Sequence, residues 1–483
     1  MLNLLPGPIV EIVGTGAIPK QVQLIGSRLK LDGSIFKEGT GWSAKIEPSA
    51  SRWDGEKLPP PSGSYRLKID SNSAKFIGAN TPAETLFFGH SRIRFRVEET
   101  EVWVVFTAPL ADDEVGSENQ SRLETEYRAA NSTVTDSVFF ESFYGRNASC
   151  NPLALDRELA RIKPETARYW SVVDASVQVP EGSIAVIEGS REWWNARAEA
   201  KLIIINDWLR NRFRPKSQQK VLQTWHGTML KRLALSRKGL RVRPALATLR
   251  ERSRWDALLA QNDYSKRIFR RSYAYFGPIW EEGYPRDDVL ISGEPTDVRS
   301  KLGIRKGAKV LLYAPTWRDD RPEKVDHLDV ADFSAKLGKD WVVLIRGHSR
   351  TITPGSDVES TGVIDVTTYP DVSELFLVAD VLVTDYSSVM FDFTVTGKPI
   401  FFYTPDLERY RGDLRGFYFD FLPAAPGPVV TDSIELARLV RDSSATKDKF
   451  AARYQEWRKR FNPHDDGKAA ERVVARLIKE RFI

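Results

Sequence analysis

Hydrophobic and polar positions alternate over the first part of the chain and give way to longer apolar runs near residue 135. The early segments that alternate or run apolar between clusters of Gly, Pro, Asn and Asp are 22–25, 65–69, 93–97 and 102–106. Short strands separated by regular turns are typical of antiparallel sheets. The pattern therefore predicts a small, sandwich-like β-rich accessory domain over residues 1–130.

Continuous apolar runs alternate with amphipathic, helix-like stretches from residue 135 onward. The first series of expected strands is 138–145, 169–173, 183–187, 202–205, 221–224 and 257–260. The second series is 289–291, 310–313, 341–345, 362–365, 381–383 and 399–402. Strands that alternate with helices indicate parallel sheets with helical crossovers.

The two series predict an α/β fold with a pair of Rossmann-type domains, over residues 135–285 and 286–450, followed by C-terminal helices over 451–483. Two doubly wound domains in succession imply a cleft between them. In such sheets, ligands bind at the carboxyl ends of the strands. The residues that directly follow the apolar runs are therefore the candidates for a functional site.

Composition narrows the class of protein. The chain has 483 residues, of which 41% are hydrophobic and 28% charged, as is ordinary for a folded protein. No run approaches about 18 apolar residues, so we expect no membrane span, and the N-terminus lacks the pattern of a signal peptide. Cys150 is the only cysteine, which excludes an internal disulfide and favours a cytosolic setting. With five scattered histidines beside it, we expect no metal site.

Positive charge is concentrated in one segment. The net charge is +6, and residues 231–254 carry many Lys and Arg but a single Glu, mixed with Leu, Val and Ala. This segment is either a solvated helical face or a basic amphipathic stretch that meets anionic lipid or a polyanionic substrate. No nucleic-acid-binding motif accompanies it, and we expect no nucleic-acid partner.

The stretch 381–393 reads as strand, sharp turn and helix, with Ser387 or Ser388 at the helix N-cap. Such a turn points backbone N–H groups and the positive end of a helix dipole into a crevice, where a phosphate can bind. Thr384, Ser387 and Ser388 add hydroxyl groups. Asp385 could accept from a ribose or from an amide of the turn.

Two histidines follow apolar runs directly: His226 after 221–225 and His348 after 341–345. Histidine titrates near neutral pH, so it can take a proton from an attacking hydroxyl or stabilise a phosphate. Arg318 and Arg346 also lie just past expected strands, and a guanidinium matches phosphate oxygens with two parallel hydrogen bonds. Because the two histidines occupy matching positions, a functional role is favoured for the pair over a structural one.

Taken together and in order, four motifs strongly resemble the CDP-glycerol glycerophosphotransferase family, which makes wall teichoic acid polymers. They are Gln223 to Lys231 (QTWHGTMLK), Leu312 to Asp319 (LYAPTWRD), Arg346 to His348 (RGH), and the pair Asp371 to Leu375 and Thr384 to Asp392. The resemblance covers roughly residues 135–480. It implies a GT-B fold, in agreement with the two expected Rossmann-type domains.

The resemblance also implies roles for these residues. His226 would be the general base, and His348 and Arg346 would stabilise phosphate charge. Donor and phosphate binding would fall to Thr316, Arg318, Arg346, Thr384, Asp385, Ser387 and Ser388. The acceptor side would include Gly227, Thr228 and Lys231. CDP-glycerol would be a substrate, with no cofactor and no metal.

The expected activity is transfer of glycerol phosphate, or another polyol phosphate, from a CDP-alcohol donor to a lipid-linked or polymeric acceptor, with release of CMP. The enzyme would lie peripherally on the inner face of the cell membrane, against an anionic surface. Two alternatives stay open. One is a GT-B glycosyltransferase that uses a nucleotide sugar, and the other is a non-catalytic scaffold that binds the polymer or its membrane.

Overall fold

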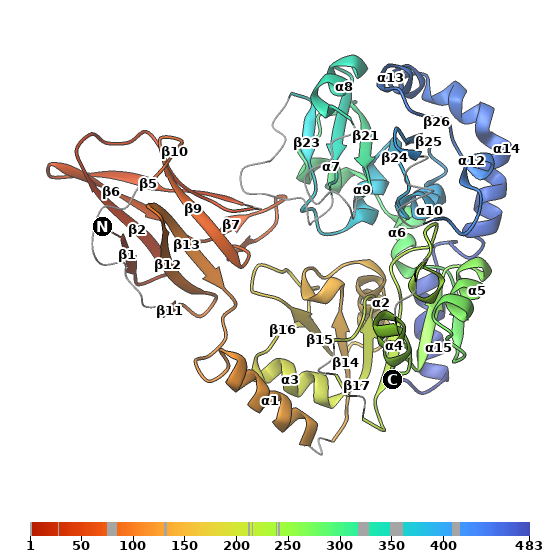
Figure 1. Cartoon of the computed structure of the whole chain (residues 1–483), viewed down its shortest axis with the longest axis horizontal. Helices are drawn as coiled ribbons and strands as arrows, with labels where there is room; N and C mark the ends of the chain where they lie inside the picture. The colour runs from red at the N-terminus through yellow and green to blue at the C-terminus, as the bar shows by residue number, and fades with distance from the viewer. Residues whose placement is uncertain are drawn as a thin grey trace.

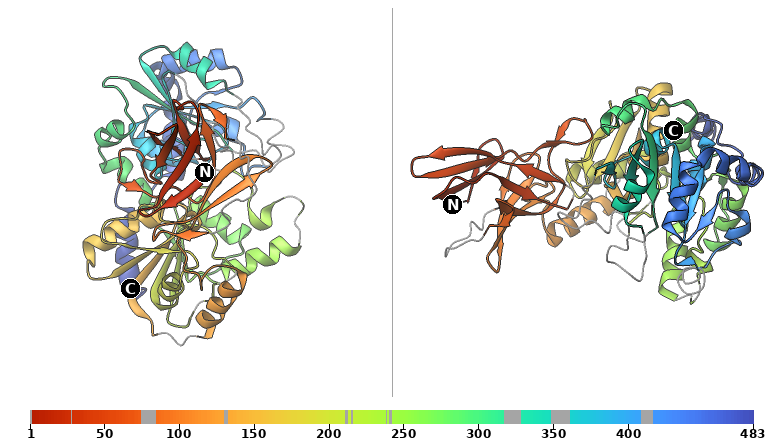
Figure 2. Two further views of the ribbon diagram at one scale, coloured as in Figure 1. Left: turned by 90° about the vertical axis from the view of Figure 1, so that its left-hand side faces the viewer. Right: turned by 90° about the horizontal axis from the view of Figure 1, so that it is seen from above.

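The structure, a computed structural model, describes residues 2–27, 29–74, 85–129, 133–210, 213–214, 216–237, 239, 242–316, 328–347, 361–407 and 416–483. An N-terminal β region stands beside two α/β units that face each other (Figures 1 and 2). This arrangement confirms the predicted class, a GT-B-like pair of parallel sheets preceded by an antiparallel β-rich region.

The N-terminal region consists of two antiparallel sheets. One has the order β1 (Leu2–Leu5), β2 (Ile9–Thr15), β6 (Gly41–Ile46) and β5 (Ser34–Glu38). The other has the order β11 (Leu86–Phe87), β12 (Arg92–Glu98), β13 (Glu101–Thr107), β9 (Gly63–Ile69), β3 (Val22–Ile25) and β4 (Lys30–Asp32), with β10 (Asn72–Ser73) beside β9. Alternate side chains of both sheets, among them Val10, Trp42, Leu67 and Phe95, share one buried core. The period-two pattern in the sequence reflects this single shared core.

The first α/β unit contains a parallel sheet with the strand order β16-β15-β14-β17-β18-β19-β20. The strands are β14 (Thr135–Glu141), β15 (Ala167–Val172), β16 (Ile184–Ile187), β17 (Ala200–Ile205), β18 (Lys220–Gln223), β19 (Ala257–Ala260) and β20 (Ile279–Glu281). The helices of this part are α1 (Ser117–Ala129), α2 (Cys150–Ile162), α3 (Arg191–Glu199), α4 (Val242–Arg252) and α5 (Asp263–Ser272). From β14, the strands that come next in the chain are added on one side of the sheet up to β16, and those from β17 onward are added on the other side. The boundary between β14 and β17 is therefore the switch point, where Rossmann-type sheets bind ligands.

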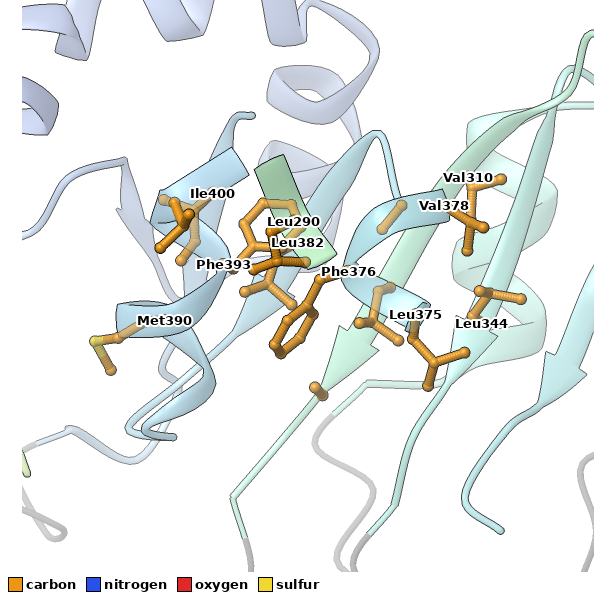
Figure 3. Close-up of a cluster of buried hydrophobic side chains, with 14 of the residues drawn as sticks. Leu290, Val310, Leu344, Leu375, Phe376, Val378, Leu382, Met390, Phe393 and Ile400 are labelled. Carbon is orange, nitrogen blue, oxygen red and sulfur yellow. The ribbon is translucent and has the colours of Figure 1, made fainter. Parts of the chain in front are cut away.

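The second unit repeats this topology with the order β23-β22-β21-β24-β25-β26. Its strands are β21 (Lys309–Ala314), β22 (Trp341–Ile345), β23 (Val363–Asp365), β24 (Val381–Thr384), β25 (Ile400–Tyr403) and β26 (Val429–Val430). Buried side chains of α9 (Val372–Val378) and α10 (Val389–Phe393) pack against this sheet, as Phe376 and Phe393 do in Figure 3. The switch point here lies between β21 and β24.

One expected strand is wrong. Residues 289–291 belong to the short helix α6 (Val289–Ser292). Leu290 is buried in the second core while Ile291 is 50% exposed, so the run has one buried side and does not cross a sheet. An apolar run of three residues does not distinguish strand from helix. The edge strand β20 (Ile279–Glu281), which the sequence did not predict, precedes it.

The two C-terminal helices connect the units. Tyr454, Trp457 and Phe461 of α14 (Ser443–Phe461) join the core of the second unit. Val473, Val474 and Leu477 of α15 (Ala469–Lys479) return to the core of the first unit, beneath β14 and β17. Within the described part of the chain, every helix is too short or too polar to span a bilayer.

The β region touches both α/β units. Trp53, between the strands β7 (Ala50–Ser51) and β8 (Lys57–Leu58), packs edge-on against Tyr369 of the second unit, with ring centroids 5.4 Å apart. The backbone N–H of Ser62 donates to Asp174 Oδ2 of the first unit at 2.7 Å. The β region therefore bridges the two units.

Candidate functional site

The predicted site residues that the structure describes lie at the carboxyl ends of parallel strands. In the second unit, Thr316 follows β21, Arg346 follows β22, and the turn 384–388 follows β24. These three strands are neighbours in the sheet, so their ends meet at one edge. In the first unit, His226 follows β18, which is next to the switch-point strand β17.

The turn after β24 is fixed by its own side chains. Thr384 is fully buried, and its hydroxyl donates to the carbonyl oxygen of Ala314 at 2.7 Å. Asp385 Oδ1 accepts from the backbone N–H of Thr316 at 2.9 Å and from that of Tyr386 at 2.5 Å. Asp385 thus accepts from backbone amides, one of the two kinds of partner expected for it. This carboxylate ties the loop after β21 to the loop after β24, at the switch point.

Ser388 lies at the predicted N-cap of α10. Its side chain makes no capping hydrogen bond, and the helix that it precedes has five residues. Ser387 and Ser388 are both partly exposed, unlike Thr384 and Asp385. Ser387 and Ser388 are therefore the residues of this turn that are partly accessible to solvent.

His226 is held by a backbone carbonyl. Its Nδ1 lies 2.6 Å from the carbonyl oxygen of Asn206, at the end of β17. Because a carbonyl oxygen only accepts, Nδ1 carries the proton and Nε2 is left as an acceptor. The ring stacks on Trp225, with centroids 5.4 Å apart, and Phe143 lies 5.7 Å away on a tilted plane. This half-buried imidazole has the tautomer and the fixed orientation that a general base requires.

Backbone strain gathers around this histidine. Phe143 and Tyr144, which follow β14, have φ angles of 48° and 58°, and Trp225 has a φ of 58°. A left-handed conformation is unfavourable for residues with large side chains and persists only where the surroundings impose it. The strain places the rings of Phe143 and Trp225 beside His226.

The two units meet at Gly227. A Cβ atom at this glycine would lie 2.9 Å from Ser388 Oγ and 3.1 Å from Ser388 Cβ. The residue after His226 therefore lies against the serine that begins α10. Leu230 and Arg232 extend the junction, because their backbones bond to Tyr418 and Gly416 of the second unit. Lys231 between them forms a bridge with Phe417.

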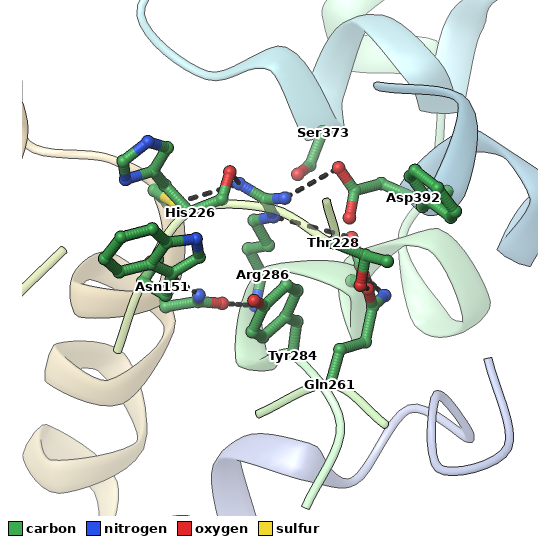
Figure 4. A network of polar contacts seen from close by, with 12 residues as sticks. Asn151, His226, Thr228, Gln261, Tyr284, Arg286, Ser373 and Asp392 are labelled. Carbon is green, nitrogen blue, oxygen red and sulfur yellow. Dashed lines mark hydrogen bonds and ion pairs between the residues drawn. The ribbon is translucent and has the colours of Figure 1, made fainter. Parts of the chain in front are cut away.

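Arg286 is the centre of a buried polar network at this junction (Figure 4). Its Nη1 donates to the carbonyl oxygen of His226 at 2.9 Å, and its Nη2 donates to Asp392 Oδ2 at 2.6 Å. Its backbone N–H donates to Asn151 Oδ1, and Asn151 Nδ2 in turn donates to the carbonyl oxygens of Thr224 and Trp225. One guanidinium thus holds the histidine loop of the first unit to α10 of the second.

Further buried acids complete the network. Gln261 Nε2 donates to Asp287 Oδ2 at 3.0 Å and to Asp465 Oδ2 at 2.8 Å. Burial raises the pKa of Asp287 well above its usual range and raises the pKa of Asp465 to about 6. Thr228, expected on the acceptor side, is fully buried here and its hydroxyl donates to Gln261 Oε1 at 2.5 Å. These contacts fix Thr228 within the first unit, against the end of β19.

Arg346 has a guanidinium without a close carboxylate partner among the described residues. Its Nη1 donates to the carbonyl oxygens of Tyr369 at 2.8 Å and Val366 at 3.1 Å. Burial lowers the pKa of Arg346 to about 10, so the group is still charged at neutral pH. The charge of Asp371 acts on this guanidinium, but no described carboxylate is within ion-pair distance of it, and a charged guanidinium held by carbonyls is suited to bind an anion. Arg318 and His348 lie outside the described residues.

Sequence reasoning missed Arg286 and Asn206. Arg286 begins the charged triplet 286–288, which directly follows Pro285 and lies between apolar stretches. A charged run in such a position is a signal that could have been used. Asn206 directly follows β17, the same placement that singled out the histidines. The described residues contain no cluster of His, Cys, Asp and Glu that could hold a metal ion.

Comparison with known proteins matches residues 125–479 to the family described as CDP-Glycerol:Poly(glycerophosphate) glycerophosphotransferase. A teichoic acid poly(glycerol phosphate) polymerase of Bacillus subtilis (strain 168) is 36% identical over 362 residues, which cover 71% of this chain and 48% of the relative. A teichoic acid glycerol-phosphate transferase of Staphylococcus aureus (strain NCTC 8325 / PS 47) is 33% identical, over 71% of this chain and 92% of the relative.

Among solved structures, the wall teichoic acid polymerase TagF superposes with a TM-score of 0.71 at 33% identity, over 76% of this chain and 94% of that one. The chain spans about half the length of the first polymerases it matches, 48% and 51%. The family match begins at residue 125, after the N-terminal β region.

Proposed function

Because this chain belongs to the CDP-Glycerol:Poly(glycerophosphate) glycerophosphotransferase family, we propose that it transfers glycerol phosphate from CDP-glycerol to a poly(glycerol phosphate) acceptor and releases CMP. The single observation that carries the proposal is the position of His226. Its Nδ1 is bound to a backbone carbonyl, and its neighbour Gly227 lies against Ser388 of the other unit.

The reaction needs a base on one side and an anion site on the other. His226 Nε2 takes the proton of an acceptor hydroxyl, and the oxygen attacks the phosphorus that bears the glycerol. The bond from that phosphorus to the CMP oxygen breaks, and CMP leaves with the electron pair. Phosphoryl transfer depends on positioning and charge stabilisation more than on covalent chemistry.

The donor side of the proposal uses the strand ends of the second unit. Arg346 neutralises phosphate charge, while Ser387 and Ser388 donate from the turn after β24. Asp385 acts by holding the loop of Thr316 against this turn, through its hydrogen bond to the Thr316 amide. Arg318 and His348 stay candidates for the same anion by their motifs.

The acceptor is a lipid-linked or polymeric chain, and the enzyme works peripherally on an anionic inner membrane face. The support for this is α4, which lies in the basic segment 231–254. Val242 is 75% exposed and Leu246 is 58% exposed on this helix, which also carries Arg243 and Arg250 on its surface. Exposed apolar side chains beside arginines are typical of helices that lie in a membrane interface.

The test is release of CMP from CDP-glycerol by the purified protein in the presence of a poly(glycerol phosphate) acceptor. The His226→Ala variant should lose roughly 10²–10⁴-fold in turnover, as expected for a general base. The matched control is His464→Ala, because His464 lies outside the site and pairs with Glu281. The His464→Ala variant should keep full activity.

Undiminished turnover by His226→Ala would refute the assignment of the base. Parallel assays replace CDP-glycerol with CDP-ribitol or nucleotide sugars and identify the nucleotide released. Release of a nucleoside diphosphate from a nucleotide sugar, with no CMP from CDP-alcohols, would replace the proposal with glycosyl transfer.

A further inference from the structure

A cavity of about 390 Å³ opens on the first unit, between the strand ends and α4. Its walls include Tyr144, which follows β14, Trp208 and Arg210, which follow β17, and Arg250, Glu251 and Arg254 from α4 and the turn after it. The volume is within the range of small-molecule sites in proteins. The cavity therefore lies at the carboxyl edge of the sheet, on the switch-point strands.

Guanidinium groups dominate the chemistry of this cavity. Arg250 is exposed, and no carboxylate of the described residues lies within ion-pair distance of it. Arg210 lies over the ring of Tyr144, with its guanidinium carbon 5.2 Å from the ring centroid, and pairs with Glu188. Arg254 is held in place by the carbonyl oxygen of Leu209 at 2.7 Å and by Glu251 at 3.1 Å.

The one carboxyl group in the wall is engaged by the protein. Glu251 is buried, and its Oε1 accepts from the backbone N–H of Leu209 at 2.6 Å. Of the three guanidinium groups, Arg210 pairs with Glu188 and Arg254 with Glu251, and Asp207 is hydrogen-bonded to Tyr144. Arg250 is therefore the guanidinium of the wall whose charge no described carboxylate offsets at ion-pair distance. Tyr144 and Trp208 contribute aromatic walls, so an anion with a short carbon skeleton fits better than a bare ion.

The cavity wall and the surroundings of the proposed base share two segments of the chain. Phe143, whose ring is 5.7 Å from that of His226, directly precedes Tyr144 of the cavity wall. Asn206, whose carbonyl oxygen holds His226 Nδ1, is two residues before Trp208. The anion site expected for the donor lies on the other unit, at the ends of β21, β22 and β24. The cavity therefore lies on the unit that carries His226, which is the acceptor side of the proposed reaction.

We propose that this cavity binds a phosphodiester of the acceptor chain, one or more polyol units behind the hydroxyl that His226 deprotonates. The inference rests on the proposed function for the identity of the chain, a polyol phosphate. Arg250 and Arg210 contact the phosphate, and Tyr144 and Trp208 pack against the polyol. The subsite retains the acceptor next to the base and so favours chains over free glycerol.

The experiment compares two charge reversals on the same helix. Arg250→Glu removes a guanidinium of the cavity, while Arg243→Glu makes the same change at an exposed arginine of α4 outside the cavity wall. Binding of a soluble glycerol phosphate oligomer, free of lipid, is measured by calorimetry. A charge-assisted hydrogen bond is worth about 1.5–3 kcal/mol, so Arg250→Glu should weaken binding roughly tenfold or more. Arg243→Glu should leave it unchanged.

A second arm separates the two sources of phosphate. Vesicles of phosphatidylglycerol mixed with phosphatidylcholine are sedimented with the same variants. If Arg250→Glu reduces vesicle binding but leaves oligomer binding intact, the cavity receives a lipid headgroup and the proposal is overturned. Equal loss with Arg243→Glu in the oligomer assay would also overturn it, because a diffuse basic surface would then explain binding.

The outcome is distinguishable from failure of the proposed function. Oligomer binding that depends on Arg250 in a protein that releases no CMP would support the subsite and reject the activity. If the protein releases CMP and Arg250→Glu leaves the KM for the acceptor unchanged, the activity is supported and the subsite is rejected. Affinity for CDP-glycerol, measured alone, should be the same in both variants.

Discussion

Arg286 Nη2 donates to Asp392 Oδ2 at 2.6 Å, and both side chains are almost completely buried between the two α/β units. The same guanidinium holds the carbonyl oxygen of His226. Arg286 precedes the second sheet, and Asp392 lies on α10, which follows β24. Their contact thus fixes the position of the histidine loop in the first unit.

Loss of this cation should be strongly destabilising. Arg286→Met would leave Asp392 buried without its charge partner, and breaking a buried pair costs about 3–5 kcal/mol. The measurement is the free energy of unfolding in urea. As a control, Arg267→Met breaks an exposed pair with Asp263 and should cost less than about 1 kcal/mol.

The double variant Arg286→Met/Asp392→Leu separates stability from function. Replacing both partners with apolar groups is often neutral, so the free energy of unfolding should recover most of its loss. Turnover should stay low, since the carbonyl of His226 has lost its donor. Full recovery of activity in the double variant would contradict a positioning role for Arg286.

Gly227 should tolerate no side chain. In Gly227→Ala the new Cβ would approach Ser388 Oγ to 2.9 Å, closer than ordinary contacts allow, so the two units must separate slightly. Overpacking of this kind costs about 1–3 kcal/mol, and a lower Tm should report it. The second substitution Ser388→Gly removes the opposing atoms and should restore part of the Tm, because the φ of 155° at position 227 still strains an alanine. If Gly227→Ala alone melts like the parent protein, the units do not meet as closely as described.

Asp465 should make stability depend on pH. Burial raises its pKa to about 6 from an ordinary value of 3.8, so between these values the folded state binds a proton that the unfolded state has lost. Stability from this group therefore falls as pH rises through that window, by about 2–3 kcal/mol in all. Because Asn does not titrate, the difference in unfolding free energy between the parent and Asp465→Asn should change with pH in that direction. A difference that is constant from pH 4 to pH 7 would contradict it.

Trp53 should couple the β region to the donor side. Its ring packs on Tyr369, whose carbonyl oxygen accepts from Arg346. Trp53→Ala removes an aromatic pair worth about 1 kcal/mol and should speed hydrogen exchange around residues 366–371. Trp103→Ala is the control, because Trp103 stacks with Arg66 and Arg96 within the β region. Equal exchange in the two variants would mean that the bridge carries no coupling.

Much of the fold followed from local patterns. The strands β21, β22 and β24 are continuous buried runs, and a run buried on both faces is apolar at every position. Asp371 is the N-cap of α9, where its Oδ1 accepts from the Ser373 amide, and Asp is among the residues preferred at that position. The one wrong strand, at α6, was too short for its period to be readable.

Hydrophobic patterns did not predict the order of the strands in each sheet or the contacts between distant segments. Thr228 carries the same motif signal as His226, yet its hydroxyl is buried against Gln261. Only the fold could separate the two, because burial depends on what packs from other segments. The cavity beside α4 likewise combines residues that follow β14 and β17 with a helix more than thirty positions along the chain.

The sequence by itself determined which residues follow the ends of parallel strands, since hydrophobic period and turn residues are local properties of the chain. From this came the strand ends at His226, Arg346 and Thr384 to Ser388. The tertiary structure alone decided that Gly227 meets Ser388, that Arg286 joins His226 to Asp392, and that Asn206 fixes the proton on Nδ1. These contacts join segments far apart in the chain, and their energies depend on burial that exists only once both units have packed together.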